Sequence, residues 1–228
     1  MIIAIDGPAG AGKSTVARTI AHKLGFLYID TGAIYRALTL KALDERIGER
    51  DILRLVEMAN NTTIELMNEP DGFLRVLLDG RDVTDIIRQT HITKLVSEIA
   101  KIKEVRQVML ELQRRLGMSR DSVLDGRDIG TVVFPDADKK FFIDAQFPER
   151  VKRRYNELKE LGHDVSLEAV ELDLRNRDTI DSNREVAPLK KAEDAIYIDT
   201  TNMTIEEVVN KVLNEIKSTP PGHFKKYG

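Results

Sequence analysis

The sequence contains no cysteine and no tryptophan, and only 5% of its 228 residues are aromatic. The absence of cysteine excludes disulfide bonds, thiolate metal sites and a cysteine nucleophile. The low aromatic content argues against a lectin-like or antibody-like surface built on aromatic side chains. No apolar run approaches the roughly 20 residues that span a bilayer, and the first residues lack the basic start and long apolar run of a signal peptide. We therefore expect a cytoplasmic protein with no membrane contact.

A strong charge bias is also missing, since the formal net charge is −3 with 32% charged residues. Proteins that bind nucleic acids normally carry a net basic balance or a basic stripe, so we expect no nucleic-acid polymer as a partner. The length and the 42% hydrophobic content suit one α/β domain over residues 1–228 with an inserted subdomain. We expect this domain to be a monomer.

The first 43 residues alternate between strand and helix patterns. Short apolar runs at Ile2–Ile5 and Phe26–Ile29 predict buried strands, and helical spacing predicts helices over Lys13–Leu24 and Ala33–Leu43. This βαβα order predicts a parallel sheet with helices on its faces.

The alternation then breaks at a group of short strand-like segments. Thr62–Met67, Phe73–Leu78 and Arg81–Val83 are separated by turn residues, which predicts a small antiparallel insert. A long helix ending at Gly117 should follow, with its apolar face on every third or fourth residue.

The α/β pattern resumes after Gly117. Strands are expected at Ser122–Leu124, Lys140–Ile143 and Ala195–Ile198, and helices at Pro148–Leu161 and Thr204–Ile216. A highly charged stretch, Gly162–Pro188, separates the last two strands, and residues 218–228 are expected to form a frayed tail.

A glycine-rich loop lies between the first strand and the first helix and reads GPAGAGKST. Small residues at this spacing let successive backbone N–H groups turn inward around a phosphate, and the following helix aims its positive end at the same place. The lysine should reach the β- and γ-phosphates of a nucleotide, and the serine should be a Mg²⁺ ligand. The ATP-binding residues expected from this motif are Gly7, Pro8, Ala9, Gly10, Ala11, Gly12, Lys13, Ser14 and Thr15.

The loop alone does not name the substrate. Switch GTPases share it, but they read guanine with an Asn/Thr-Lys-x-Asp segment, whereas Asn210-Lys211 is followed here by Val212-Leu213. Motor and helicase ATPases usually need longer chains. A small-molecule kinase is the interpretation that this chain favours.

Four strings along the chain resemble the bacterial cytidylate kinases, a branch of the nucleoside monophosphate kinases. They are GPAGAGKST, DTGAIYR, DGRDIGTVVFPDAD and RNRDTIDSNREVAPL. The resemblance implies a P-loop NTPase-type parallel sheet flanked by helices, with an antiparallel β insert in the monophosphate-binding part, at about 35–105, and a short lid at about 150–188. It also implies a reaction in which ATP, with Mg²⁺, phosphorylates CMP or dCMP.

The same resemblance implies roles for individual residues, and arginine suits phosphate because its planar fork binds two oxygens at once. The catalytic residues carried over are Lys13, Arg127, Arg153 and Arg184. The substrate-binding residues carried over are Thr31, Arg36, Ser97, Arg106, Arg127, Asp128, Arg177, Asp181 and Arg184.

Two acidic residues of the DGRD string have alternatives. Asp128 matches the family residue that accepts from the amino group of cytosine and repels the carbonyl of uracil, but it is also interpretable as a structural acid paired with Arg127. Asp125 is the candidate for holding Mg²⁺ through water, together with Ser14, and it is also interpretable as a strand-terminal turn residue. Two alternatives for the whole protein are a kinase of UMP, AMP or shikimate, and a non-catalytic nucleotide-binding module.

Overall fold

The computed structural model describes residues 1–218, apart from the side chain of Lys94. The expected tail at 218–228 therefore lies outside the described residues, except for Ser218. None of the helices within 1–218 combines the length and the apolar composition that crossing a membrane requires.

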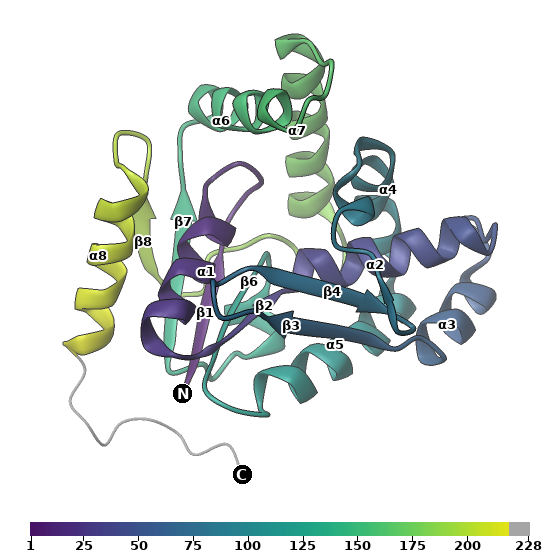
Figure 1. Ribbon diagram of the computed structural model, residues 1–228, viewed down its shortest axis with the longest axis horizontal. Coiled ribbons are helices and arrows are strands. Elements are labelled where there is room, and N and C mark those ends of the chain that lie inside the picture. The colour runs from purple at the N-terminus through teal and green to yellow at the C-terminus, as the bar shows by residue number, and fades with distance from the viewer. Residues whose placement is uncertain (219–228) are drawn as a thin grey trace.

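The centre of the fold is a five-stranded, fully parallel sheet (Figure 1). Its strand order is β2-β6-β1-β7-β8. The strands are β1 (Ile2–Asp6), β2 (Leu27–Asp30), β6 (Ser122–Gly126), β7 (Lys139–Asp144) and β8 (Ile196–Asp199). The middle strand β1 is buried along its whole length, which explains its nearly continuous apolar sequence. The parallel sheet expected from the βαβα pattern is confirmed.

Helices flank this sheet. They include α1 (Lys13–Leu24), α2 (Thr31–Asp44), α5 (Lys103–Gly117) and α8 (Ile205–Lys217). Helix α1 ends at Gly25 in the left-handed conformation, and α8 begins with a capping box between Thr204 and Glu207. The two helices pack against one another, while α5 lies against β2 and β6.

A second, antiparallel sheet is inserted between α2 and α5, as the sequence predicts. It consists of β3 (Ile64–Asn68), β4 (Leu74–Leu78) and β5 (Arg81–Asp82) in that order. Asn68 ties it to the main sheet, because its side-chain amide accepts from the N–H of Tyr28 at 2.9 Å and donates to the Tyr28 carbonyl at 3.1 Å. Its inner residues, such as Val76 and Leu78, join the main hydrophobic core.

The insert also contains helical segments that the sequence pattern does not predict. They are α3 (Ile52–Asn60), the 3₁₀ turn η1 (Ile86–Arg88) and α4 (Thr90–Ala100). Helix α3 has nine residues and its buried residues are Leu55, Met58 and Ala59. Helix α4 begins after Gln89 without a side-chain cap. Helix α3 has a start signal, because the side chain of Asp51 accepts from the N–H of Arg54, but the helix is short. Helix α4 lacks such a signal.

Helices α6 (Phe147–Glu160) and α7 (Leu167–Asn183) form a hairpin that stands above the glycine-rich loop in Figure 1. Most of the charged stretch forms the single helix α7. The hairpin has a small hydrophobic core of its own, distinct from the core of the sheet. The buried members of this hairpin core are Ala9, Val151, Leu158, Val170 and Leu174. Ala9 belongs to the glycine-rich loop, so the hairpin packs directly on that loop.

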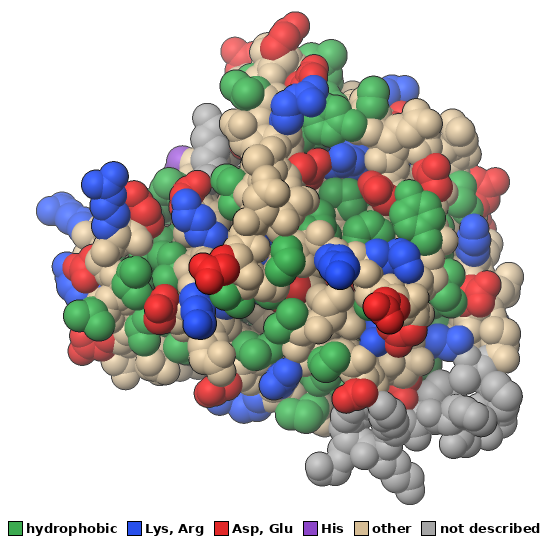
Figure 2. Space-filling view, turned by 180° about the vertical axis from the view of Figure 1, so that it is seen from behind, with side chains coloured by type: hydrophobic (Ala, Val, Ile, Leu, Met, Phe, Trp, Pro, Cys, Tyr) green, Lys and Arg blue, Asp and Glu red, His purple; other side chains and the backbone are tan. Residues whose placement is uncertain are grey.

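On the face of the molecule seen in Figure 2, basic and acidic side chains are interspersed among apolar ones. Neither sign forms a continuous stripe on that face. This distribution agrees with the small net charge of the whole sequence.

The first glycine of the loop has a steric reason to be glycine. Gly7 has φ 150°, and a Cβ built on it would lie 1.9 Å from the carbonyl oxygen of Ile143 in β7. We therefore expect Gly7→Ala to lower the free energy of unfolding by about 2 kcal/mol or more, since backbone has to move. Gly48→Ala is the control, because nothing lies within 4 Å of a Cβ there. Denaturant unfolding of both variants measures the difference, and equal stabilities would contradict this close contact.

Candidate active site

The parallel strands present their carboxyl ends at one edge of the sheet, where open α/β sheets bind ligands. Acidic residues gather there, because β1, β2, β7 and β8 each end in aspartate and Asp125 is the penultimate residue of β6. A cavity of about 410 Å³ opens at this edge, between the glycine-rich loop, the insert and α7. This volume is suited to a small-molecule ligand.

The cavity collects most of the residues predicted from the sequence. They are Ala9, Gly10, Gly12, Lys13, Ser14, Thr15, Thr31, Arg36, Ser97, Arg106, Asp125, Arg127, Asp128, Arg177, Asp181 and Arg184. The predicted residues that do not line it are Gly7, Pro8, Ala11 and Arg153. Residues from the amino-terminal loop, the insert, the DGRD string and α7 therefore converge on one space.

The wall of this cavity is strongly cationic. Nine basic side chains face five carboxylates in a protein whose net charge is −3. The basic residues are Lys13, Arg18, Arg36, Arg88, Arg106, Arg127, Arg154, Arg177 and Arg184. Such a concentration of charge is suited to an anionic ligand, and above all to phosphate groups.

Lys13 is the first residue of α1 and is 5% exposed. Its Nζ donates to the carbonyl of Pro8 at 3.0 Å, so the side chain folds back over the glycine-rich loop. Burial and the neighbouring Arg127 guanidinium lower the pKa of Lys13 to about 7, against the attraction of Asp125. Additional negative charge in the cavity would restore the ammonium form.

Ser14 and Asp125 meet at the base of the cavity. The Ser14 hydroxyl donates to Oδ2 of Asp125 at 2.7 Å, and the buried Tyr28 hydroxyl donates to Oδ1 at 2.8 Å. Thr31 donates to the Asp125 carbonyl at 2.7 Å, which ties the start of α2 to the same point. Burial and Asp30 raise the pKa of Asp125 to about 6. The glycine-rich loop and β2 therefore both hold the carboxylate of Asp125.

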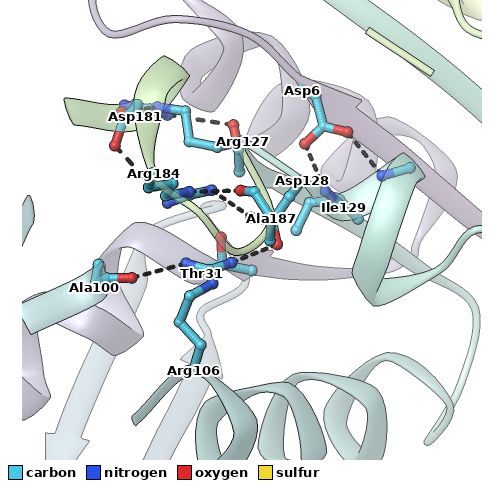
Figure 3. Close-up of polar contacts among 12 residues, drawn as sticks. Asp6, Thr31, Ala100, Arg106, Arg127, Asp128, Ile129, Asp181, Arg184 and Ala187 are labelled. Carbon is cyan, nitrogen blue, oxygen red and sulfur yellow. Dashed lines mark hydrogen bonds and ion pairs between the residues drawn. The ribbon is translucent and has the colours of Figure 1, made fainter. Parts of the chain in front are cut away.

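Arginines and acids in the cavity wall form a set of ion pairs (Figure 3), connected by Arg184, which pairs with both Asp128 and Asp181. Arg127 pairs with Asp181 at 2.8 Å, which joins the segment directly after β6 to α7. Asp128 receives Arg106 on Oδ2 and Arg184 on Oδ1, the latter at 3.1 Å. Asp128 is thus a partner of Arg106 and Arg184, and the alternative that pairs it with Arg127 is wrong.

Several guanidinium groups in the cavity wall have unused hydrogen-bonding capacity. Among the described residues, the buried Nε atoms of Arg36, Arg154 and Arg177 have no hydrogen-bond partner. Burial and the neighbouring Arg127 lower the pKa of Arg177 to about 10. A buried donor without a partner is costly, and all three residues line the cavity.

Residues 3–218, nearly the whole chain, match the model of the cytidylate kinase family. The chain belongs to the cytidylate kinase family. The cytidylate kinase of Desulforamulus reducens is 52% identical over 215 residues, which covers 94% of this chain and 96% of that protein. The cytidylate kinase of Caldanaerobacter subterraneus subsp. tengcongensis is 50% identical over 222 residues, which covers 97% of each.

The fold is also similar to that of a solved structure with a distant sequence. An uncharacterized protein from Eubacterium ventriosum aligns with a TM-score of 0.51 at 13% identity, covering 96% of this chain and 99% of the other. This likeness concerns the fold alone. The family relationship of the cytidylate kinases rests on the sequence matches.

On α6, the arginine that lines the cavity is the neighbour of the one expected from the resemblance to the cytidylate kinases. Arg153 bonds Glu149 at 3.0 Å and Thr200, through Oγ1 at 3.0 Å and the carbonyl at 2.6 Å, and it does not line the cavity. Arg154 lines the cavity instead. The helical period contains this signal, because Arg154 is three residues after Val151 and four before Leu158, both of which are buried in the hairpin core.

Further cavity residues of this cytidylate kinase family member have no counterpart in the sequence-based prediction. Arg18 lies one turn beyond the phosphate-loop motif on α1, and Arg88 ends the 3₁₀ turn of the insert. Tyr35 carries the guanidinium of Arg106 over its ring, with 5.5 Å between Cζ and the ring centroid. Only Tyr35 lies inside one of the strings that carry the family resemblance, so the other two had no such signal.

Proposed function

We propose that the protein transfers the γ-phosphoryl group of ATP to CMP or dCMP, giving ADP and CDP or dCDP. In this reaction an oxygen of the acceptor's phosphate forms the new bond to the γ-phosphorus, and the bond from that phosphorus to the bridging β-oxygen breaks. The observation that carries the proposal is that the phosphate loop and the acid Asp128 line one cationic cavity. The names of the cytidylate kinase relatives support the choice of acceptor.

The donor end of the proposed site is the loop Gly7–Thr15. Its backbone N–H groups and the start of α1 would hold the phosphates of ATP, and Lys13 would lie against the β- and γ-phosphates. In phosphoryl transfer, the protein contributes mainly position and electrostatic stabilisation. Lys13 is suited to this because it is already buried in the cavity wall.

The residues present fit a Mg²⁺ ion that accompanies ATP. Ser14 and Asp125 bring hard oxygen ligands to one point, 2.7 Å apart, next to the phosphate loop. We propose that Ser14 binds the ion and that Asp125 holds it through water. The ion would neutralise charge on the transferred group. Tyr28 would keep the Asp125 carboxylate in place through its second oxygen.

The acceptor end of the proposed site is built on arginines. Arg36, Arg127 and Arg184 would hold the phosphate of CMP, with Arg177 beside them. Arg154, whose Nε is buried without a partner, is the α6 residue that we propose at the transferring phosphates. This is the role expected for Arg153, whose side chain is instead engaged with Thr200.

We propose that Asp128 and Asp181, the acids paired with these arginines, also contact the base and the sugar of the acceptor. Asp128 has about four lone-pair positions, and Arg106 and Arg184 use two, so it retains capacity to accept from the amino group of cytosine. Ser97 and Arg106 would complete the base contacts. Asp181 would contact a sugar hydroxyl, and Thr31 lies at the same wall.

We also propose that the parts of the chain divide this work within one kinase domain. The segment at about 35–105 would bind the monophosphate, and the region at about 150–188 would act as a lid that excludes water. The packing of α6 and α7 on Ala9 supports this, because the hairpin already covers the phosphate loop. We take the protein to act as a cytoplasmic monomer on small-molecule nucleotides, with no nucleic-acid polymer as substrate.

A panel of acceptors tests the proposed function. In an ADP-release assay with ATP and Mg²⁺, we expect turnover with CMP and dCMP and at least about 10³-fold lower kcat/KM with UMP, since uracil lacks the amino donor. AMP and shikimate should be inactive. Equal turnover of UMP and CMP would remove the role of Asp128. ATP binding without CMP-dependent ADP release would favour a non-catalytic nucleotide-binding module.

A further inference from the structure

A buried carboxylate outside the proposed catalytic set connects the two ends of the site. Asp6 is the last residue of β1 and is 4% exposed. Its Oδ1 accepts from the N–H of Ile129 at 2.8 Å, and its Oδ2 accepts from the N–H of Gly130 at 2.7 Å (Figure 3). Both oxygens are therefore used on backbone that lies 123 and 124 residues away in the sequence.

Those two amides open a short π-helix, η2 (Ile129–Val133). The first N–H groups of a helix have no partner within the helix, so Asp6 supplies acceptors that the chain there does not. π-helical turns are rare and occur often at functional sites. The backbone of η2 closes on itself through the N–H groups of Val132 and Val133, which both donate to the Asp128 carbonyl. Asp6 satisfies the N–H groups of Ile129 and Gly130 from outside the segment.

A cation from another helix holds the opposite end of η2. Arg114 on α5 donates from Nε to the carbonyl of Val133 and from Nη2 to the carbonyl of Val132, both at 2.9 Å. An anion at the amino end and a cation at the carboxyl end also suit the dipole of the segment. We call the two side chains of Asp6 and Arg114 the η2 clamp.

The position of η2 in the chain makes the η2 clamp relevant to the reaction. Asp128 directly precedes η2, and Gly7, the first residue of the phosphate loop, directly follows Asp6. Asp6 is also the register partner of Gly126 across the β1–β6 pair. Asp6 is thus covalently joined to the phosphate loop, and it is linked by two hydrogen bonds to the segment that follows Asp128.

The carboxylate form of Asp6 is under opposing influences. Burial raises its pKa to about 7, while the N–H groups of Gly130 and Ile129 and the charge of Lys13 lower it. Burial of the Asp6 carboxylate is costly, and both of its oxygens are hydrogen-bonded. We therefore expect this carboxylate to have a specific structural role.

We propose that the η2 clamp is a positioning device that sets Asp128 against the phosphate loop, so that selectivity for cytosine depends on Asp6 and Arg114. This inference rests on the proposed function, in which Asp128 reads the base. Neither clamp residue lines the cavity, so both would act through η2. A displacement of about 1 Å at a positioned group can cost roughly 100-fold in rate, which makes a small shift of η2 measurable.

The test compares Arg114→Gln with Arg115→Gln. Arg115 is the next residue on α5 and is exposed, so it is a matched control. We expect Arg114→Gln to lower the CMP-to-UMP ratio of kcat/KM by about tenfold, with Arg115→Gln unchanged. Affinity for a non-hydrolysable ATP analogue should stay within about twofold in both, because Arg114 does not contact the phosphate loop.

Asp6→Asn tests the other end of the clamp. It keeps the shape of the side chain but sets an amide donor against one backbone N–H. Asp6→Asn should lower the CMP-to-UMP ratio of kcat/KM by more than Arg114→Gln does. The double variant should lower that ratio by less than the product of the two single effects, because both residues act on η2. Hydrogen exchange at the amides of Ile129 and Gly130 should accelerate in Asp6→Asn.

The outcomes separate this inference from the proposed function. In one outcome, the wild-type protein prefers CMP, and both clamp variants keep its CMP-to-UMP ratio of kcat/KM and lose only thermal stability. The positioning role is then wrong and the proposed function stands. If the wild-type protein shows no preference for CMP, the proposed function fails, and unchanged amide exchange in Asp6→Asn would then overturn the clamp as well. Arg114→Gln keeps the test available if Asp6→Asn does not fold.

Discussion

Replacement of Lys13 by alanine is expected to lower kcat with CMP by about 10³-fold or more, while the protein remains folded. Its ammonium is the basic group of the phosphate loop, and it is held over that loop by the Pro8 carbonyl. Without it, the charge that develops on the transferred phosphoryl group loses a preorganised cation. In the protein without nucleotide, burial destabilises the ammonium form of Lys13 and lowers its pKa. The unfolding midpoint should therefore stay the same or rise.

Lys23→Ala is the matched control, because Lys23 lies on the same helix in its last turn and is exposed. Steady-state ADP release gives the activity of both variants, and thermal unfolding gives their stability. Loss of turnover in Lys13→Ala alone, with an intact fold, would support the phosphate-loop assignment. Retained turnover in Lys13→Ala would contradict it.

Asp128→Asn should reduce the CMP-to-UMP ratio of kcat/KM by about 10³-fold. The amide can present its NH₂ group to the carbonyl of uracil, and the carboxylate that repels uracil is gone. Turnover with CMP should itself fall, since Arg106 and Arg184 lose a charged partner. Arg106 keeps its bond to the carbonyl of Ala100 at 3.1 Å, so the variant should fold with a lower unfolding midpoint.

Asp164→Asn, in the exposed turn between α6 and α7, controls for the loss of one negative charge. Kinetics with both acceptors, measured well below the unfolding midpoint, separate selectivity from stability. An unchanged CMP-to-UMP ratio in Asp128→Asn would show that the base is read elsewhere. A ratio that changes equally in both variants would point to the overall charge of the protein.

The features that sequence reasoning predicted well depend on local patterns. The glycine-rich loop lies between β1 and α1 as expected, because its small residues and its position after a short apolar run are visible in the sequence. The five parallel strands are short apolar runs followed by polar turns. Even the antiparallel insert is visible, because Asp79-Gly80 is a strong turn signal between its second and third strands.

The features that sequence reasoning missed depend on contacts between distant segments. Helix α3 spans only nine residues, and its buried Leu55, Met58 and Ala59 pack into the main core next to α5. Asp6 looks like an ordinary strand end, because its partners lie more than 120 residues further along the chain. Arg153 and Arg154 are adjacent, and the helical period places Arg154 on the face of Val151 and Leu158, but the packing of the hairpin decides which face meets the cavity.

The hairpin of α6 and α7 has a core of its own that is much smaller than that of the sheet. Proteins open locally in cooperative units whose opening free energies differ widely, and those with few buried apolar contacts open most easily. The hairpin core includes Ala9, so opening of this unit also removes packing from the phosphate loop. In the proposed function, the stability on which ATP binding depends would therefore be that of the hairpin. The unfolding midpoint of the molecule, which is dominated by the sheet, can remain high after nucleotide affinity is lost.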